Sequence, residues 1–235
     1  MNRKDINEDA IFFHTINASR FDNHYHSKKS FTERYTLWTK LIDKYNFNNK
    51  RIIDIGCGSG VLSFYLATKN NTVIGIDGSP KMIELCCEKL DPKNTNLSFV
   101  QKTIPFNSKK FISFDGIICS SVLEYIKDVD ATLDLFNELL IESGTLIVSV
   151  PNNLSLYRIL EKLLFKIIKR PRYYKYVYNL YSFNKFKSLL KEKGFQVKEV
   201  SYYSRSTSIL DFFSFIKSSK YFNNLFVCVC TKVNS

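Results

Sequence analysis

Residues 51–60 read Arg-Ile-Ile-Asp-Ile-Gly-Cys-Gly-Ser-Gly, and this stretch decides the fold. The isoleucines before the glycines are β-branched and bounded by turn-forming residues, which predicts a short buried strand. Glycine at alternate positions then lets the chain turn sharply and lets backbone N–H groups approach a ligand closely. Apolar residues recur at helical spacing in 61–69, so we expect the glycine loop to open a helix. This order of elements predicts a cofactor pocket at the carboxyl edge of a parallel sheet.

The spacing of the glycines separates two classes of cofactor. A dinucleotide-binding loop has the pattern G-x-G-x-x-G, but here the third glycine, Gly60, comes one residue early. An acidic residue, Asp54, also precedes the first glycine by two positions. The pattern formed by Asp54, Gly56, Gly58 and Gly60 resembles the first motif, (D/E)-x-G-x-G-x-G, of the class I S-adenosylmethionine (SAM)-dependent methyltransferases. The alternative is a tight strand-to-helix turn that binds nothing.

A second apolar strand is predicted at residues 72–76 and is followed by Asp77. An acidic side chain at the end of this strand can accept hydrogen bonds from both hydroxyls of a ribose. Ser79 and Pro80 suit the N-cap and the first position of the next helix. The run Asp-Gly-Ser-Pro-Lys-Met resembles the family pattern D-x-S-x-x-M, which implies that Asp77 binds the ribose and Met82 lies against the adenine. The alternative is an ordinary turn aspartate and a core methionine.

The adenine contact departs from the family pattern. After the third predicted strand the family often has an acidic residue ahead of Leu-Pro-Phe, but this chain has Gln-Lys-Thr at 101–103 before Ile-Pro-Phe at 104–106. Backbone amides near Lys102 and Thr103, or the side chain of Gln101, are the expected substitutes. The residues predicted to bind SAM are Asp54, Gly56, Cys57, Gly58, Gly60, Asp77, Gly78, Met82, Thr103 and Ser120.

The fourth predicted strand covers residues 114–120, and the candidates for catalysis lie at its end and directly after it. Val-Leu-Glu-Tyr follows at 122–125, where many small-molecule methyltransferases carry V-L-E-H. The resemblance implies that Ser120, Glu124 and Tyr125 lie nearest to the methyl donor. The alternative is that Glu124 and Tyr125 only support the start of a helix.

The resemblance implies that residues 1–48 form a helical segment that covers the cofactor, ahead of a methyltransferase domain at 49–235. Imidazole suits proton abstraction near neutral pH, and all the histidines of the chain lie in this segment. They are His14, His24 and His26. We take His24 as a further candidate for the general base, the alternative being histidines of a surface loop.

The charge is unevenly distributed along the 235 residues. Residues 1–150 hold 18 Lys and Arg against 18 Asp and Glu, whereas 151–235 hold 16 against 4. The last third therefore meets something anionic or forms a solvated basic face. Nucleic acid is not the expected partner, because the chain lacks the (N/D)-P-P-(Y/F) and Pro-Cys signatures of base-methylating enzymes.

The cysteines and the hydropathy predict a cytoplasmic protein. The six cysteines show neither a C-x-x-C motif nor metal-like spacing with histidine, which favours reduced thiols and predicts no metal site. The first ten residues are charged, unlike a signal peptide, and no apolar run is long enough to span a bilayer.

A basic lid insertion is predicted at about residues 152–181. An apolar stripe and a basic stripe run along 154–170, and tyrosines alternate with cations at 172–178. Such a helix can lie on an anionic membrane surface. The run Ser-Val-Pro-Asn-Asn-Leu-Ser-Leu at 149–156 resembles the ubiquinone-biosynthesis O-methyltransferases, which carry a membrane-touching lid here. The lid covers a substrate pocket alone, or it also docks 154–178 on the inner face of the membrane.

The strand and helix patterns predict a single α/β domain. The resemblance implies that it is Rossmann-like: a doubly wound, seven-stranded, mostly parallel sheet in the order 3-2-1-4-5-7-6, with strand 7 antiparallel. A helix is expected at 209–222, between the last two strands. The resemblance implies SAM-dependent methylation of an oxygen, with nitrogen less favoured, on a small or lipid-linked metabolite. The alternatives are an RNA or protein methyltransferase recruited by the basic third, and a non-catalytic SAM-binding protein.

Overall fold

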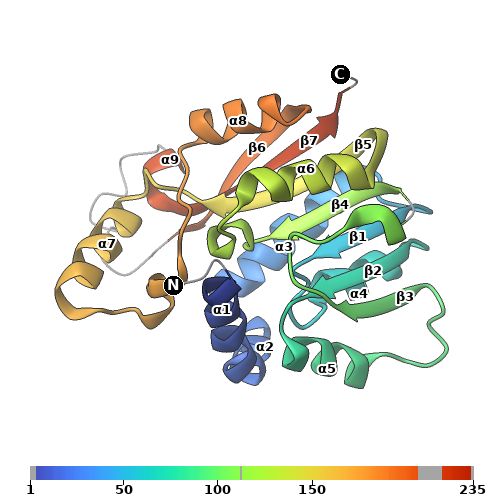
Figure 1. Ribbon diagram of the computed structural model, residues 1–235, viewed down its shortest axis with the longest axis horizontal. Coiled ribbons are helices and arrows are strands. Elements are labelled where there is room, and N and C mark those ends of the chain that lie inside the picture. Colours follow the sequence, from blue (N-terminus) through green and yellow to red (C-terminus); the bar gives the residue numbers. More distant parts are fainter. Residues whose placement is uncertain (1–3, 112, 206–218, 234–235) are drawn as a thin grey trace.

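The computed structural model describes residues 4–111, 113–205 and 219–233. Its centre is a seven-stranded sheet in the order β3-β2-β1-β4-β5-β7-β6 (Figure 1). The strands are β1 (Arg51–Ile55), β2 (Thr72–Asp77), β3 (Leu97–Gln101), β4 (Phe114–Ser120), β5 (Leu140–Pro151), β6 (Phe195–Arg205) and β7 (Asn223–Lys232). Strands β1 to β5 pair in parallel, and β7 lies antiparallel between β5 and β6. The predicted fold class and strand order are confirmed.

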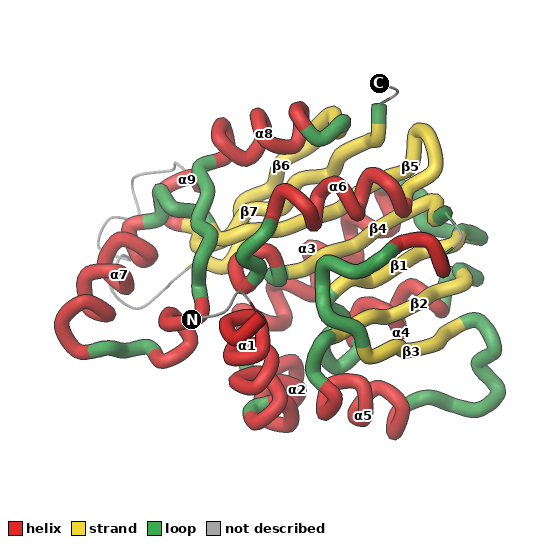
Figure 2. The backbone as a smooth tube through the Cα atoms, viewed as in Figure 1, coloured by secondary structure: helices red, strands yellow, loops and turns green. Residues whose placement is uncertain are grey.

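Helices lie on both sides of this continuous sheet (Figure 2). In chain order they are α1 (Lys4–Ile16), α2 (Ala18–Ser27), α3 (Lys29–Lys44), α4 (Val61–Ala67), α5 (Pro80–Lys89), α6 (Val129–Leu139), α7 (Leu156–Ile168), α8 (Phe183–Glu192) and α9 (Ser219–Phe222). Short 3-10 helices are η1 (Ser108–Lys110), η2 (Leu123–Tyr125) and η3 (Arg172–Tyr176). Residues 206–218 are not described, so most of the helix predicted at 209–222 lies outside the described residues.

Side chains of the central strands point alternately to the two faces of the sheet, and an apolar core forms on each face. Ile53 of β1 and Ile117 of β4 pack with the apolar sides of α6 and α8. Their neighbours Ile52 and Ile118 point the other way, toward α3 and α4. All four side chains are fully buried, and burying an isoleucine stabilises a fold by about 1.5–3 kcal/mol. This two-sided burial explains why β1 reads as an almost unbroken apolar run.

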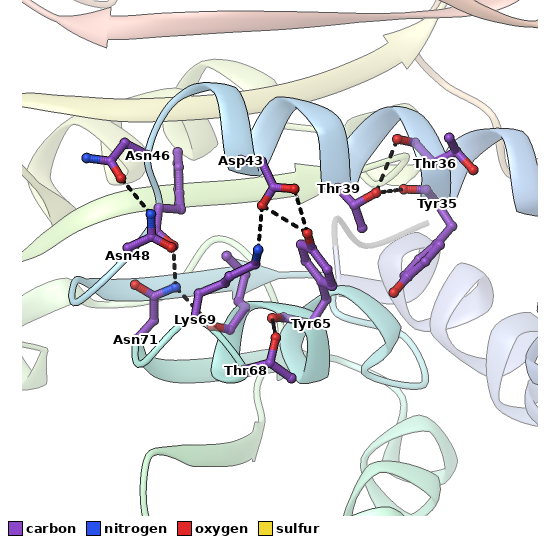
Figure 3. A network of polar contacts seen from close by, with 12 residues as sticks. Tyr35, Thr36, Thr39, Asp43, Asn46, Asn48, Tyr65, Thr68, Lys69 and Asn71 are labelled. Carbon is purple, nitrogen blue, oxygen red and sulfur yellow. Dashed lines mark hydrogen bonds and ion pairs between the residues drawn. The ribbon is translucent and has the colours of Figure 1, made fainter.

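A polar network ties the end of α3 to α4 (Figure 3). Asp43 accepts a hydrogen bond from the Tyr65 hydroxyl at 2.8 Å and forms an ion pair with Lys69 at 2.8 Å. Asn71 donates to the carbonyl of Phe47 at 2.8 Å. These contacts hold the C-terminal end of α3 against the body of the fold.

The N-terminal helices pack beside the carboxyl edge of the sheet, next to α5 (Figure 1). The Thr15 hydroxyl donates to the Ser79 hydroxyl at 2.9 Å, and Lys89 pairs with Asp22 at 2.6 Å. α7 stands apart from the sheet in the same view. Among the described residues, no helix has the length and apolar character needed to cross a membrane. The predicted division at residues 48 and 49 remains a prediction.

Candidate active site

The glycine loop after β1 uses its glycines in two different ways. Gly56 and Gly58 both have a left-handed backbone, with φ of +73° and +55°. A Cβ on Gly56 would lie 2.1 Å from Cγ2 of Val122, so packing alone requires glycine there. A Cβ on Gly58 would meet only the Phe21 ring, at 3.5 Å. The backbone at Gly58 therefore borders open space, as a ligand-binding loop must.

Asp77 at the end of β2 holds this loop in place. Its Oδ2 accepts from the Gly58 N–H at 2.9 Å, and its Oδ1 accepts from the Ser79 N–H at 2.8 Å. Burial raises the pKa of Asp77, and these two hydrogen bonds oppose that shift. The carboxylate borders the cavity described below, and each oxygen retains a lone pair that can accept from a ribose hydroxyl.

Asp54 lies at the inner end of the loop and is 2% exposed. Burial raises its pKa to about 7, although the Ser63 hydroxyl donates to it at 2.6 Å and opposes the shift. A small hollow of about 30 Å³ adjoins it and is also lined by Tyr25 and Arg34. A buried carboxyl group in this setting favours a cationic ligand group, which would stabilise its ionised form.

A cavity of about 1240 Å³ opens at the carboxyl edge, whereas one small ligand usually occupies about 300–1,000 Å³. The cavity therefore has room for a cofactor and a second substrate. The predicted residues that line it are Gly56, Gly58, Asp77, Gly78, Met82, Thr103, Ser120, Glu124, Tyr125 and His24. Asp54 and Cys57 line the adjoining hollow. Gly60 lines neither space and is the N-cap of α4, so its left-handed φ of +82° serves the turn.

Two serines at the end of β4 line the cavity, and their buried hydroxyls have no hydrogen-bond partner among the described residues. They are Ser120 and Ser121. Ser121 has a φ of +58°, a conformation in which a side chain is strained. Unpartnered hydroxyls, the open edge at Gly58 and the carboxylate of Asp77 form a cradle whose size and polarity fit SAM.

The expected adenine contacts are only partly available. The Lys102 N–H already donates to the carbonyl of Asp77 at 2.9 Å. Thr103 borders the cavity, whereas Gln101 does not. Of the substitutes predicted for the missing carboxylate, Thr103 is therefore the best placed.

Glu124 is a buried acid that faces the cavity, and it is 4% exposed. Its Oε2 has no partner among the described residues. Burial raises its pKa to about 7, opposed by a backbone hydrogen bond and by the nearby Arg34 and Arg158. Such a carboxylate can take up a proton near neutral pH. Burial also raises the pKa of Tyr125, well beyond that of a useful base.

The structure places His14 deeper in the site than His24. The His14 ring packs edge-on against Tyr125, with 4.8 Å between ring centroids, and burial lowers its pKa to about 4. His24 is more open, and its pKa is lowered by burial and by the cations Lys28 and Arg20. Both imidazoles border the cavity, and no side-chain position is described for His26.

Two arginines that the sequence analysis missed also line the cavity. Arg34 of α3 hydrogen-bonds to Tyr25. The sequence feature that could have indicated a partly buried Arg34 is its position on the same helical face as the apolar Trp38. Arg158 of α7 pairs with Glu161, the single acid of that helix. In the sequence, a cation on an apolar helix face could have indicated the role of Arg34, and a single acid in a basic helix could have indicated that of Arg158. Among the described residues, no group of three or more His, Cys, Asp or Glu is arranged to hold a metal.

Comparison with known proteins defines the class. Residues 46–203 match the family described as "Methyltransferase domain", and the chain belongs to this family. The strand order and the loops described above are those of its class I, SAM-dependent members. The predicted family, enzyme class and cofactor class are thus confirmed.

Individual relatives are also methyltransferases by name, but each matches a smaller part of the chain. The mitochondrial ubiquinone biosynthesis O-methyltransferase of Schizosaccharomyces pombe is 31% identical over 131 residues, which are 54% of this chain and 47% of that protein. The putative methyltransferase YqeM of Bacillus subtilis is 32% identical over 107 residues, 43% of this chain and 41% of that protein. The chain spans about half the length of the curated relatives it matches.

Solved structures show the same fold across nearly the whole chain. Magnesium protoporphyrin IX methyltransferase from Synechocystis PCC 6803, with bound S-adenosylhomocysteine (SAH), superposes with a TM-score of 0.70. The two are 18% identical, and the match covers 94% of this chain and 96% of that one. At this identity the likeness shows the fold alone.

Proposed function

We propose that this protein transfers a methyl group from SAM to an oxygen of a small or lipid-linked metabolite, with nitrogen as the less favoured acceptor. One observation carries the proposal: a single cavity is lined both by Asp77 and by Glu124, whose Oε2 has no hydrogen-bond partner among the described residues. The relative named as a ubiquinone biosynthesis O-methyltransferase supports the choice of oxygen. When bound, SAM would supply an electrophilic methyl group on a sulfonium.

The cofactor end of the cavity offers a group for each polar part of SAM. Asp77 suits the ribose, and the open backbone at Gly58 allows close approach. Asp54 and Arg34 both line the small hollow, where the ionised carboxylate of Asp54 and the guanidinium of Arg34 would complement the ammonium and carboxylate of an amino acid. Met82, which is 2% exposed, offers an apolar wall for the adenine.

At the acceptor end we propose Glu124 as the group that receives the hydroxyl proton. Its pKa of about 7 leaves part of the population ionised at neutral pH, and proton removal of this kind is one part of catalysis. Holding the acceptor in line and excluding water are the other parts. His24 remains the second candidate for the base, and Tyr125 forms a wall of the site beside His14.

The lid at about 152–181 supports a lipid-linked acceptor. Among the described residues, one side of α7 exposes large apolar side chains, of which Leu164 and Ile168 also line the cavity: Leu156, Ile159, Leu160, Leu163, Leu164, Ile167 and Ile168. Lys162 and Lys166 stand between them along the helix, and Lys169 follows it. We therefore propose that the protein is cytoplasmic and that 154–178 docks on an anionic membrane surface, peripheral on the inner face of the membrane.

The test uses the purified protein, methyl-labelled SAM and a cell extract separated into lipid, aqueous small-molecule, nucleic-acid and protein fractions. We expect label in the lipid or the small-molecule fraction. Glu124→Gln should lower the rate at least tenfold, because the proton then has no buried carboxylate to receive it. Glu192→Gln, an exposed change at the end of α8, should not. Label confined to polymer, or no transfer at all, would contradict the proposal.

A further inference from the structure

Arg158 is a cation in the cavity whose hydrogen bonds are incomplete. Its side chain is 12% exposed, and its Nε has no partner among the described residues. Its Nη1 donates to Glu161 at 2.6 Å and to the Tyr173 hydroxyl at 3.0 Å. Tyr173 in turn donates to Glu161. Leaving a buried N–H without a partner costs stability, so this arrangement is incomplete as it stands.

The partners of Arg158 hold its guanidinium from one side. Arg158 and Tyr173 border the cavity, whereas Glu161 does not. The side chain of Glu161 is 2% exposed, so it acts as a counter-charge that solvent does not reach. The fork of Arg158 is therefore fixed in orientation before any ligand arrives, and this is what a precise binding site requires.

The charges that line the cavity favour an anionic acceptor. Five cations border it, against two acids. The cations are Arg20, Lys28, Arg34, Arg158 and Arg170, and the acids are Asp77 and Glu124. Once Asp77 and Arg34 are assigned to the cofactor, four cations remain with Glu124. A cavity lined mainly by one sign of charge attracts ligands of the opposite sign.

We propose that Arg158 binds an oxyanion of the methyl acceptor, a carboxylate or a phosphate, and thereby selects the substrate. This inference rests on the proposed function, because it specifies the acceptor of the same site. The planar guanidinium fork matches such groups in two-point hydrogen bonding. With Glu124 as the acceptor of the hydroxyl proton, the substrate carries both a hydroxyl and an oxyanion. Glu161 and Tyr173 are positioning residues that hold the arginine.

Small aromatic probes test the charge preference directly. Benzoate, phenyl phosphate and neutral benzyl alcohol are titrated by calorimetry into the protein loaded with SAH. We expect at least one anion to bind tenfold or more tightly than benzyl alcohol, because hydrogen bonds between charged partners are stronger than neutral ones. The stronger of the two anions identifies carboxylate or phosphate as the group bound. Equal affinity for all three probes, or no binding of either anion, would overturn the inference.

Paired variants separate an anion site from a structural ion pair. Arg158→Gln alone would leave Glu161 buried without its partner, which destabilises a fold strongly. The double change R158Q/E161Q removes both charges and should reduce the anion preference to less than about twofold. E161Q alone keeps the arginine without its counter-charge and should tighten anion binding several-fold. The exposed Lys191→Gln on α8 is the control for net charge.

The two variants must shift anion affinity in opposite directions, which a purely structural role would not produce. A change in the same direction, or an anion preference retained by the double variant, would sink the inference. The melting temperature and the affinity for SAH are measured alongside to show that each variant is folded. If SAH does not bind the wild-type protein, the proposed function falls and takes this inference with it. If SAH binds and the anions show no preference, this inference falls alone.

Discussion

At the scale of single residues, Gly56 and Gly58 have different roles: Gly56 avoids a clash with Val122, whereas Gly58 leaves the backbone open to the cavity. Gly58→Ala introduces a methyl group into open space at a left-handed backbone position, so the protein should fold at a cost of about 1–2 kcal/mol. The proposed SAM site includes this open space, so SAH binding should weaken at least tenfold. Gly56→Ala should destabilise the protein far more, because its Cβ would lie 2.1 Å from Val122.

Thermal unfolding and calorimetric titration with SAH measure the two effects separately. Gly144 lies on β5, away from the cavity lining, and a Cβ there would lie 2.8 Å from the Ile141 carbonyl. Gly144→Ala is thus a control that should lower stability without a specific loss of cofactor affinity. Wild-type SAH affinity in Gly58→Ala would contradict the assignment of the loop.

Asp54 predicts a pH dependence of stability in the cofactor-free protein. Its pKa is raised to about 7 in the fold by burial, compared with about 3.9 in the unfolded chain. The folded state therefore holds a proton that the unfolded state has released. The stabilising contribution is fully present below about pH 4 and is lost as the pH rises toward 7, by up to about 1.4 kcal/mol per unit.

Denaturant unfolding between about pH 5 and 7 checks this slope. Asp54→Asn removes the titrating group, so its stability should fall less steeply than that of the wild type across this window. Glu124 titrates in the same direction and is present in both proteins. The exposed Asp91→Asn should retain the wild-type slope. Parallel curves for wild type and Asp54→Asn would show that Asp54 is ionised in the fold.

At the scale of elements, α7 predicts selective binding to membranes. Ile167, 79% exposed, lies on the uncovered apolar side, and Ile167→Asp should weaken binding to vesicles of phosphatidylglycerol at least tenfold. Binding to phosphatidylcholine vesicles should be weak, because each lysine near an anionic surface contributes about 1 kcal/mol. Ile141→Asp on β5, where the side chain is 41% exposed, is the matched control.

Sedimentation with vesicles measures this binding, and raising the salt concentration should reduce it. Equal binding to both lipids, or no effect of Ile167→Asp, would leave α7 as a cover over the substrate cavity alone.

The elements that the sequence predicts well are those governed by local rules. The strand, glycine loop and helix at 51–69 follow from β-branched residues, left-handed glycines and apolar periodicity. The acceptor end of the cavity, in contrast, depends on how distant segments pack together in the tertiary structure. Arg34 and Arg158 lie 124 positions apart in the chain and line one cavity only because the fold brings α3 and α7 to it. Neither hydrophobic periodicity nor a sequence motif predicts that these two arginines line the same cavity.

The histidines show the same limit. The sequence placed all of them in one N-terminal segment, and we took His24 as the candidate base. In the structure α1 turns His14 onto Tyr125, whereas α2 leaves His24 more open. Burial decides their different pKa values, and burial is a property of the packed fold.

At the scale of the whole molecule, the carboxyl edge of the sheet gathers the parts of the site. β1, β2 and β4 deliver Asp54, Asp77 and Ser120 at their ends, while the N-terminal helices and α7 close around them. Part of the excess positive charge of the last third lies on the proposed membrane surface of α7, and the cation Arg158 of the same helix lines the cavity. We therefore expect the fold to join the proposed cofactor site to an acceptor site that differs from it in charge.

The most direct test is to identify the atom that receives the methyl group. The protein is incubated with an extract and SAM whose methyl carbon is isotopically labelled, and the small-molecule and lipid fractions are examined by NMR, where oxygen-bound and nitrogen-bound methyl groups resonate apart. We predict an oxygen-bound methyl group on an acceptor that also carries a carboxylate or a phosphate, formed in equal amount with SAH. A methyl group found only on protein or nucleic acid, or no SAH above background, would contradict the account.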